Sequence, residues 1–147
     1  MLQRLLLLML LLIPNLAAAD AWDEFCEWRR RVGLPQVQKD PAMMKFAQDK
    51  ANYRAYYGLQ NGHQGPKQPY SWREGTGEAT ATWGFLTCCM EEDATHGGAG
   101  LCIGKDGQRY MVLVLRGGSG QALISRHQIP VHNTSYLTPK PLSYRTR

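Results

Sequence analysis

Small and apolar residues recur every three or four positions in two segments of the chain, which predicts two helices. The clearer segment opens with the start signals Asp40 and Pro41 and ends at Gly58, a typical residue for a helix C-terminus. Its inward positions should recur every four residues, at Met43, Ala47, Ala51 and Ala55. Alanines at these positions indicate close packing against another helix or a sheet. Residues 22–32 have a similar spacing, and Gly33 should end that helix.

Two apolar runs further along the chain predict a β-hairpin. Residues 98–104 and 109–115 are joined by a short polar segment that contains Asp106-Gly107, and Asp-Gly is a strong hairpin signal. Residues 112–115 are apolar without alternation, so we expect the second strand to be covered on both faces.

The other segments have weaker patterns. Residues 59–73 are rich in Gly, Pro, Gln and Asn, which indicates a long ordered loop. Residues 78–83 are β-prone, and residues 85–90 are apolar and compatible with a helical turn. Residues 121–131 are interpreted as a docked strand.

The first 19 residues have the pattern of a secretory signal. Arg4 is the only charge before an apolar run from Leu5 to Ile13, and Ala17-Ala18-Ala19 offers a cleavage site. Cleavage after Ala21 also fits. A membrane-spanning helix needs about 20 apolar residues, so a retained anchor is the weaker interpretation. We expect a secreted or periplasmic protein whose mature chain begins at residue 20.

Composition indicates one globular domain followed by a tail. The chain has 147 residues, 44% hydrophobic and 20% charged, which excludes a wholly disordered or collagen-like chain. The net charge of +5 is too small to indicate specific nucleic-acid binding. The last 27 residues contain no Asp or Glu and four Lys or Arg. We therefore divide the chain into a domain over residues 20–117 and a basic, proline-containing, partly disordered tail over residues 118–147.

All four cysteines, Cys26, Cys88, Cys89 and Cys102, lie after the predicted signal. An even count in an exported chain suggests disulfides, and adjacent Cys88 and Cys89 should each bond elsewhere. One disulfide with two buried thiols remains an alternative. A zinc site of these cysteines with His96 is not favoured, because their spacing matches no usual zinc pattern. A cysteine nucleophile paired with His63 is not favoured either, because no oxyanion hole or orienting Asn or Asp has a signature.

Five short motifs follow one another between Glu24 and Gly117. They are Arg29-Arg30-Arg31-Val32-Gly33-Leu34-Pro35, Asp40-Pro41-Ala42, Gly62-His63, Gly77-Glu78-Ala79 and Gly98-Ala99-Gly100-Leu101. Their order and spacing resemble the CAP superfamily, whose SCP domain occurs in cysteine-rich secretory, antigen-five and plant pathogenesis-related proteins. The length is similar to that of short bacterial members.

The resemblance implies an α+β fold, an α-β-α sandwich in which helices flank a small antiparallel sheet. It also implies a cleft where two His and two Glu can hold a divalent cation such as zinc. His63 matches the first family His, and Glu78 matches the Glu of the family's GEN motif. Phe85 falls at the position of the second His, which leaves the tetrad incomplete. His96 could replace that His if the intervening segment is shorter.

These residues leave the chemistry of the expected cleft open. His63 and Glu78 supply one imidazole and one carboxylate, which is half of a zinc shell. They could hold an ion weakly, or they could form a structural pair. Six aromatic residues surround the long loop and could line a ligand groove or cover a small core: Tyr53, Tyr56, Tyr57, Tyr70, Trp72 and Trp83.

The expected function is a non-enzymatic CAP/SCP-like module with a small ligand in the cleft around His63, Glu78 and Phe85. The resemblance suggests a lipid, a sterol or a cell-envelope glycan as that ligand. One alternative is a metal-assisted hydrolase that uses His63, Glu78 and His96. The other is a purely structural envelope protein. The oligomeric state does not follow from the sequence.

Overall fold

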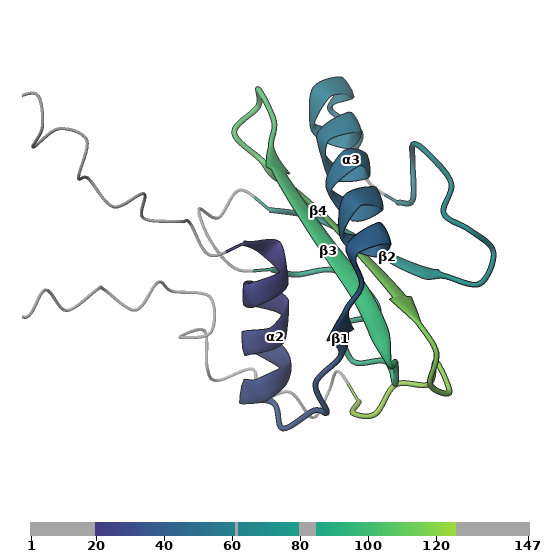
Figure 1. Cartoon of the computed structure of the whole chain (residues 1–147). Helices are drawn as coiled ribbons and strands as arrows, with labels where there is room; N and C mark the ends of the chain where they lie inside the picture. The colour runs from purple at the N-terminus through teal and green to yellow at the C-terminus, as the bar shows by residue number, and fades with distance from the viewer. Residues whose placement is uncertain (1–19, 61, 80–84, 126–147) are drawn as a thin grey trace, which may run out of the picture.

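A small sheet with one helix on each face forms the centre of the protein (Figure 1). The computed structural model describes residues 20–60, 62–79 and 85–125. The predicted signal peptide and most of the predicted tail therefore lie outside the described residues. The described elements are α2 (Ala21–Arg31), β1 (Gln38–Lys39), α3 (Pro41–Tyr57), β2 (Arg73–Ala79), β3 (His96–Ile103) and β4 (Arg109–Arg116).

The sheet has the strand order β1-β3-β4-β2. The predicted hairpin is confirmed, because β3 and β4 pair antiparallel through the Asp106-Gly107 turn. β2 adds antiparallel to the other side of β4 and forms one edge. The two-residue β1 pairs parallel with β3. The sheet is therefore mixed, whereas the family resemblance implied an antiparallel one.

The two helices cover opposite faces of β4, which explains its continuous apolar run. Met111, Leu113 and Leu115 pack with Trp22 and Phe25 of α2. The intervening Val112 and Val114 pack against α3. Because side chains alternate across a strand, a strand buried on both faces needs apolar residues at every position. The predicted α+β fold with an α-β-α arrangement is confirmed.

α3 lies very close to β3. The predicted start and end are confirmed, since the Asp40 carboxylate caps the first turn and Gly58 ends the helix in the left-handed conformation. The alanine face packs on the sheet, where a Cβ on Gly98 or Gly100 would collide with the α3 backbone at Met43 or Ala47. Small residues on both elements thus allow the helix backbone to touch the strand.

α2 begins at the predicted place and buries one face against the other side of the sheet. Asp20 caps it by accepting a hydrogen bond from the Asp23 N–H at 2.8 Å. Trp22, Phe25 and Arg29 point inward. The Arg29 guanidinium is fully buried, and it donates to the backbone carbonyl oxygens of Met90 and Glu92 at 2.7 and 3.0 Å. Arg29 therefore fixes the path of the segment that follows β2.

Two local predictions before β3 were wrong. β2 begins at Arg73, inside the predicted loop, and five residues before the β-prone segment. Residues 85–90 form an extended stretch and a turn in place of the expected helical turn. Most of the β-prone segment, residues 80–83, lies outside the described residues.

The chain after β4 continues along the surface beside residues 91–93. The Asp93 side chain accepts a hydrogen bond from the Ser119 N–H at 2.8 Å. Ala122 forms an isolated antiparallel bridge with Glu92, and the Leu123 N–H donates to the Glu91 carbonyl at 2.9 Å. Among the described residues, no helix is long and apolar enough to cross a membrane.

Candidate functional site

His63 lies in the loop after α3, and buried groups hold that loop in place. Arg54 of α3 donates to the backbone carbonyl oxygens of Leu59 and Gly62 at 3.2 and 3.3 Å. The Thr76 hydroxyl of β2 donates to the same Gly62 oxygen at 3.2 Å. The residue before His63 is therefore fixed to both a helix and a strand.

The His63 ring is held on one side and exposed on the other. Its Nδ1 lies 3.0 Å from Glu74 Oε1, and half of its side chain (50%) is exposed. Glu74 is only 1% exposed, and both its oxygens accept hydrogen bonds from Lys50 Nζ, at 2.8 and 2.7 Å. Because a carboxylate only accepts hydrogen bonds, Nδ1 carries the proton in the neutral ring and Nε2 is left as an acceptor.

Glu78 does not share this position with His63. It points to the same face of β2 as Glu74, but it is paired with the Arg54 guanidinium. Glu74 and Glu78 are four residues apart on an extended strand, which separates their backbones by about 13 Å. The carboxylate beside His63 is therefore Glu74, where the sequence prediction had Glu78.

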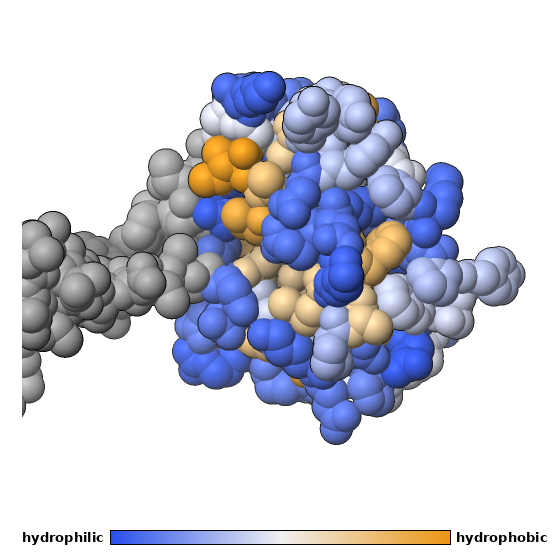
Figure 2. Space-filling model, turned by 45° about the horizontal axis from the view of Figure 1, so that its top comes forward, coloured by the Kyte–Doolittle hydropathy of each residue, from blue (hydrophilic) through white to orange (hydrophobic). Residues whose placement is uncertain are grey.

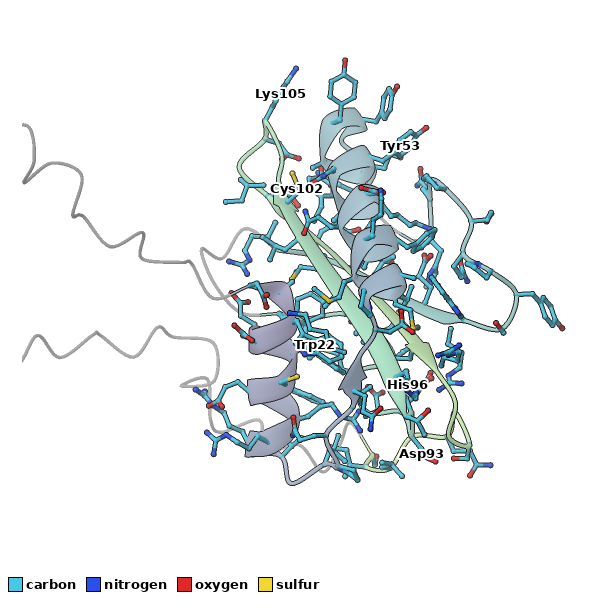
Figure 3. The ribbon with its side chains drawn as sticks, in the orientation of Figure 1. Trp22, Tyr53, Asp93, His96, Cys102 and Lys105 are labelled. Atoms are coloured by element: carbon cyan, nitrogen blue, oxygen red, sulfur yellow. The ribbon has the colours of Figure 1, made fainter. Side chains whose placement is uncertain are left out.

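His96 lies far from Glu78, at the opposite end of the sheet. It pairs with Arg116 at the end of β3 where Asp93 also lies, whereas Glu78 pairs with Tyr110 (Figure 3). Tyr110 and Arg116 are six residues apart on β4, about 20 Å along the strand. Within residues 20–60, 62–79 and 85–125, no three His, Cys, Asp or Glu side chains form a group that could hold a metal ion. The fold therefore does not bring the predicted metal ligands His63, Glu78 and His96 together.

Phe85 belongs to the core. It is 4% exposed and packs edge-on against Phe25 of α2, with ring centroids 6.2 Å apart. Its position is on the α2 side of the sheet, whereas Glu74 and Glu78 face α3. It therefore lines no site with His63.

The segment that follows Phe85 brings a thiol to His63. Cys88 Sγ lies 3.8 Å from His63 Nε2, and the Cys88 N–H donates to the Thr76 carbonyl at 3.4 Å. The segment crosses β2 beside Gly75 and Gly77. A Cβ on Gly75 would collide with the Cys88 carbonyl, and one on Gly77 with the Leu86 carbonyl. The Gly-x-Gly pattern of β2 therefore allows Cys88 to reach the strand edge.

The two adjacent thiols have different proton affinities. A hydrogen bond from the Cys89 side chain lowers the pKa of Cys88 to about 5, with a smaller contribution from the charge of His63. The same hydrogen bond, together with burial and the Glu92 carboxylate, raises the pKa of Cys89. The fold therefore favours the ionised form of Cys88 and the protonated form of Cys89.

The four cysteines do not form the expected disulfide in the structure, where all are free thiols. Cys26 packs on the α2 side of the sheet, and burial raises its pKa. Cys102 packs on the α3 side. Cys88 and Cys89 contact backbone carbonyl oxygens of β2 at Thr76 and Glu74, at 3.9 and 3.6 Å.

Sequence reasoning missed Glu74 and Lys50, although a signal exists. Lys50 and Arg54 are four residues apart on the buried face of α3. Glu74 and Glu78 are also four residues apart and lie on one face of β2. Two cations at helix spacing and two carboxylates at strand spacing on facing elements indicate paired buried ions.

These contacts define the His63 site as His63, Cys88, Glu74 and Lys50. It combines an oriented imidazole with a thiol at the edge strand β2. No model of a known protein family matches the chain, and no curated protein is similar to it in sequence.

Proposed function

We propose that this chain is an exported CAP/SCP-like module that binds a small ligand at the His63 site. The α-β-α arrangement agrees with the fold that the resemblance implies, and the pattern of residues 1–19 supports export to the periplasm or the medium. The proposal moves the ligand site from the His63–Glu78 pair to the edge of β2, where Glu74 and Cys88 meet the ring.

The observation that carries this proposal is the anchored, half-exposed imidazole of His63. Its Nδ1 is hydrogen-bonded to a carboxylate that is itself fixed by Lys50, while half of the side chain faces solvent. A side chain that is already held in one orientation loses little entropy when a ligand binds.

The neighbouring side chains favour a cell-envelope glycan over a lipid or sterol. The loop with His63 passes next to Tyr53, since a Cβ on Gly65 would lie 3.1 Å from that ring. Tyr53, Tyr56 and Tyr57 are exposed, and the Tyr57 ring contacts the rings of both others. Exposed tyrosine rings combine a flat apolar face with a polar hydroxyl, which suits a sugar. On the face seen in Figure 2, hydrophilic side chains interrupt the hydrophobic areas, whereas a lipid needs a continuous apolar groove.

A titration of the ¹⁵N-labelled protein with soluble peptidoglycan fragments tests this function. The fragments should shift the side-chain resonances of His63 and the amide resonances of residues 62–65. His63→Ala and Tyr57→Ala should each weaken the binding, whereas His96→Ala, at a half-buried histidine of β3 that β4 separates from β2, should not. Glycan binding that is indifferent to His63, or shifts produced only by fatty acid or sterol, would contradict the proposal.

The metal-assisted hydrolase has less support, because His96 is remote and Glu78 is paired with Arg54. A calorimetric titration with zinc separates the two functions. Micromolar affinity that is abolished by both His63→Ala and His96→Ala would favour the hydrolase. If the protein binds no zinc, glycan or lipid, the purely structural role is the remaining function.

A further inference from the structure

A series of three polar side chains runs from the edge of β2 into the protein. Cys88 Sγ lies 3.8 Å from His63 Nε2, and His63 Nδ1 lies 3.0 Å from Glu74 Oε1. The three side chains come from three separate segments: the loop after α3, the strand β2 and the segment after β2. A thiol, an imidazole and a carboxylate in this order have the roles of nucleophile, base and orienting group.

Neighbouring residues hold the Cys88, His63 and Glu74 side chains in position. Lys50 holds both oxygens of Glu74, and Arg54 holds the backbone just before His63. Gly75 and Gly77 allow the segment with Cys88 to lie against β2. A catalytic group is useful only when its position is restricted in this way.

The backbone at the thiol has an unusual conformation. Cys89 has a φ of 71°, the only left-handed residue other than glycine among the described residues. A side chain in this region is strained, and such strain persists where the surroundings impose it, often at functional sites. This turn sets the Cys89 thiol beside β2, where it donates to the Glu74 carbonyl oxygen at 3.6 Å.

We propose that Cys88 is a nucleophile that accepts an acyl group from a small activated ester, with His63 as its proton carrier and Glu74 as a positioning residue. This inference goes beyond ligand binding and does not depend on which ligand the His63 site takes. It needs only the Cys88, His63 and Glu74 side chains.

The step is an acyl transfer without oxidation or reduction. The Cys88 sulfur attacks the acyl carbon, and a C–S bond forms as the C–O bond to the leaving alcohol breaks. Ionisation of the Cys88 thiol places its proton on His63 Nε2, and from there the proton passes to the departing alkoxide oxygen, which leaves as the alcohol. Water can then attack the thioester carbon, which releases the carboxylic acid and returns the proton to the Cys88 sulfur.

The leaving group decides which acyl donor Cys88 and His63 can use. A thiol of lowered pKa is ionised at neutral pH but is a weaker nucleophile and a better leaving group than an ordinary thiol. An amide is cleaved only when its amine is protonated as it leaves, whereas an activated ester expels a stable anion without that help. An ester with a good leaving group is therefore the matching substrate class.

The test is the reaction of the reduced protein with p-nitrophenyl acetate. We expect a burst of p-nitrophenol and one acetyl group on the peptide that contains Cys88. Cys88→Ala should abolish the burst, and His63→Asn should slow it by about 100-fold. Cys102→Ala removes a half-buried thiol on β3 and should leave the burst unchanged. Acetylation at another residue, or an undiminished burst in Cys88→Ala, overturns the proposal.

Two further measurements address Glu74 and the state of the thiol. In the double variant Lys50→Met with Glu74→Leu, the acetylation rate should fall by about 10-fold, while alkylation of Cys88 by iodoacetamide stays unchanged. An unchanged acetylation rate would show that Glu74 is not a positioning residue. Equal losses in acetylation and alkylation would show that Lys50 and Glu74 have a structural role only. Mass spectrometry of the non-reduced protein should find Cys88 as a thiol, and a disulfide at Cys88 would overturn the inference.

Discussion

Arg54 and Glu78 form an ion pair beneath the loop that carries His63. The same guanidinium donates to the backbone oxygens of Leu59 and Gly62. Glu78 therefore affects the His63 site through Arg54 and the loop backbone, and not as a ligand beside the imidazole. The Glu78 carboxylate, which the family resemblance indicated, positions the loop through Arg54. The neighbouring Glu74 is the carboxylate that contacts the His63 ring.

Loss of the Arg54 guanidinium should destabilise the protein strongly. Arg54→Met leaves the Glu78 carboxylate without its partner and removes a donor from three backbone carbonyl oxygens, of which that of Met111 is buried. We expect the free energy of unfolding in urea to fall by about 3–5 kcal/mol. Arg30→Ala, which breaks an exposed ion pair with Glu27, is the matched control and should cause no measurable change. An Arg54→Met protein as stable as its parent would contradict the role given to this pair.

A single methyl group between α3 and β3 should also be costly. A Cβ on Gly100 would collide with the backbone of Ala47, and neither the helix nor the central strand can move away freely. Gly100→Ala should lower the free energy of unfolding by about 3 kcal/mol. Ile103→Ala, at an exposed position of the same strand, should change it by about 0.5 kcal/mol or less. Equal effects of the two substitutions would show that the contact is less tight than described.

The elements that sequence predicted well are those with local signals. α3 has its cap, its first-turn proline, its alanine spacing and its terminal glycine in one continuous segment. The β3–β4 hairpin has an apolar run on either side of Asp106-Gly107. In both cases the local pattern and the tertiary packing point to the same structure, so the sequence suffices.

β2 was misplaced because its residues are selected by contacts with distant segments. Gly75 and Gly77 are poor strand formers, but a larger residue would collide with the segment that carries Cys88. Glu74 and Glu78 are also uncommon in buried strands, but Lys50 and Arg54 of α3 neutralise them. Tertiary contacts override β propensity at four of its seven positions.

The same distant contacts explain the error in the candidate site. The motif pattern identified His63, but the choice between Glu74 and Glu78 depends on how far along β2 the loop reaches. The register between β2 and β4 determines this distance, and no local pattern encodes it.

The reactivity of Cys88 should persist into mildly acidic solution. Its pKa is about 5 in the folded chain, compared with 9.0 for an ordinary thiol, because Cys89 donates to it and His63 is near. Alkylation of Cys88 by iodoacetamide, followed by peptide mass spectrometry, should reach half of its maximal rate near pH 5. The urea-unfolded protein is the control and should show a midpoint near 9.0. Cys89→Ala removes the donor and should move the midpoint of the folded protein upward.

These two pKa shifts also determine how the free energy of unfolding depends on pH. Because folding lowers the pKa of Cys88, its contribution to stability is complete above pH 9.0 and is lost as the pH falls toward 5. Folding raises the pKa of Cys89, so its contribution is present below the ordinary value of 9.0 and is lost only at higher pH. A Cys88 midpoint near that of the unfolded chain would contradict both assignments.

The buried pair of Lys50 and Glu74 should show strong coupling in a double-mutant cycle. Both side chains are 1% exposed, so removal of one charge leaves the other in a nonpolar environment. We expect Lys50→Met alone to lower the free energy of unfolding by about 3–5 kcal/mol. Lys50→Met combined with Glu74→Leu should recover most of that loss, because apolar side chains of similar size replace the pair without an unpaired charge. The exposed pair Lys45 and Asp49 on the same helix is the control, and its cycle should show little coupling. If the double variant is no more stable than Lys50→Met, the His63–Glu74 contact is the dominant interaction of the carboxylate, and the ion pair is secondary.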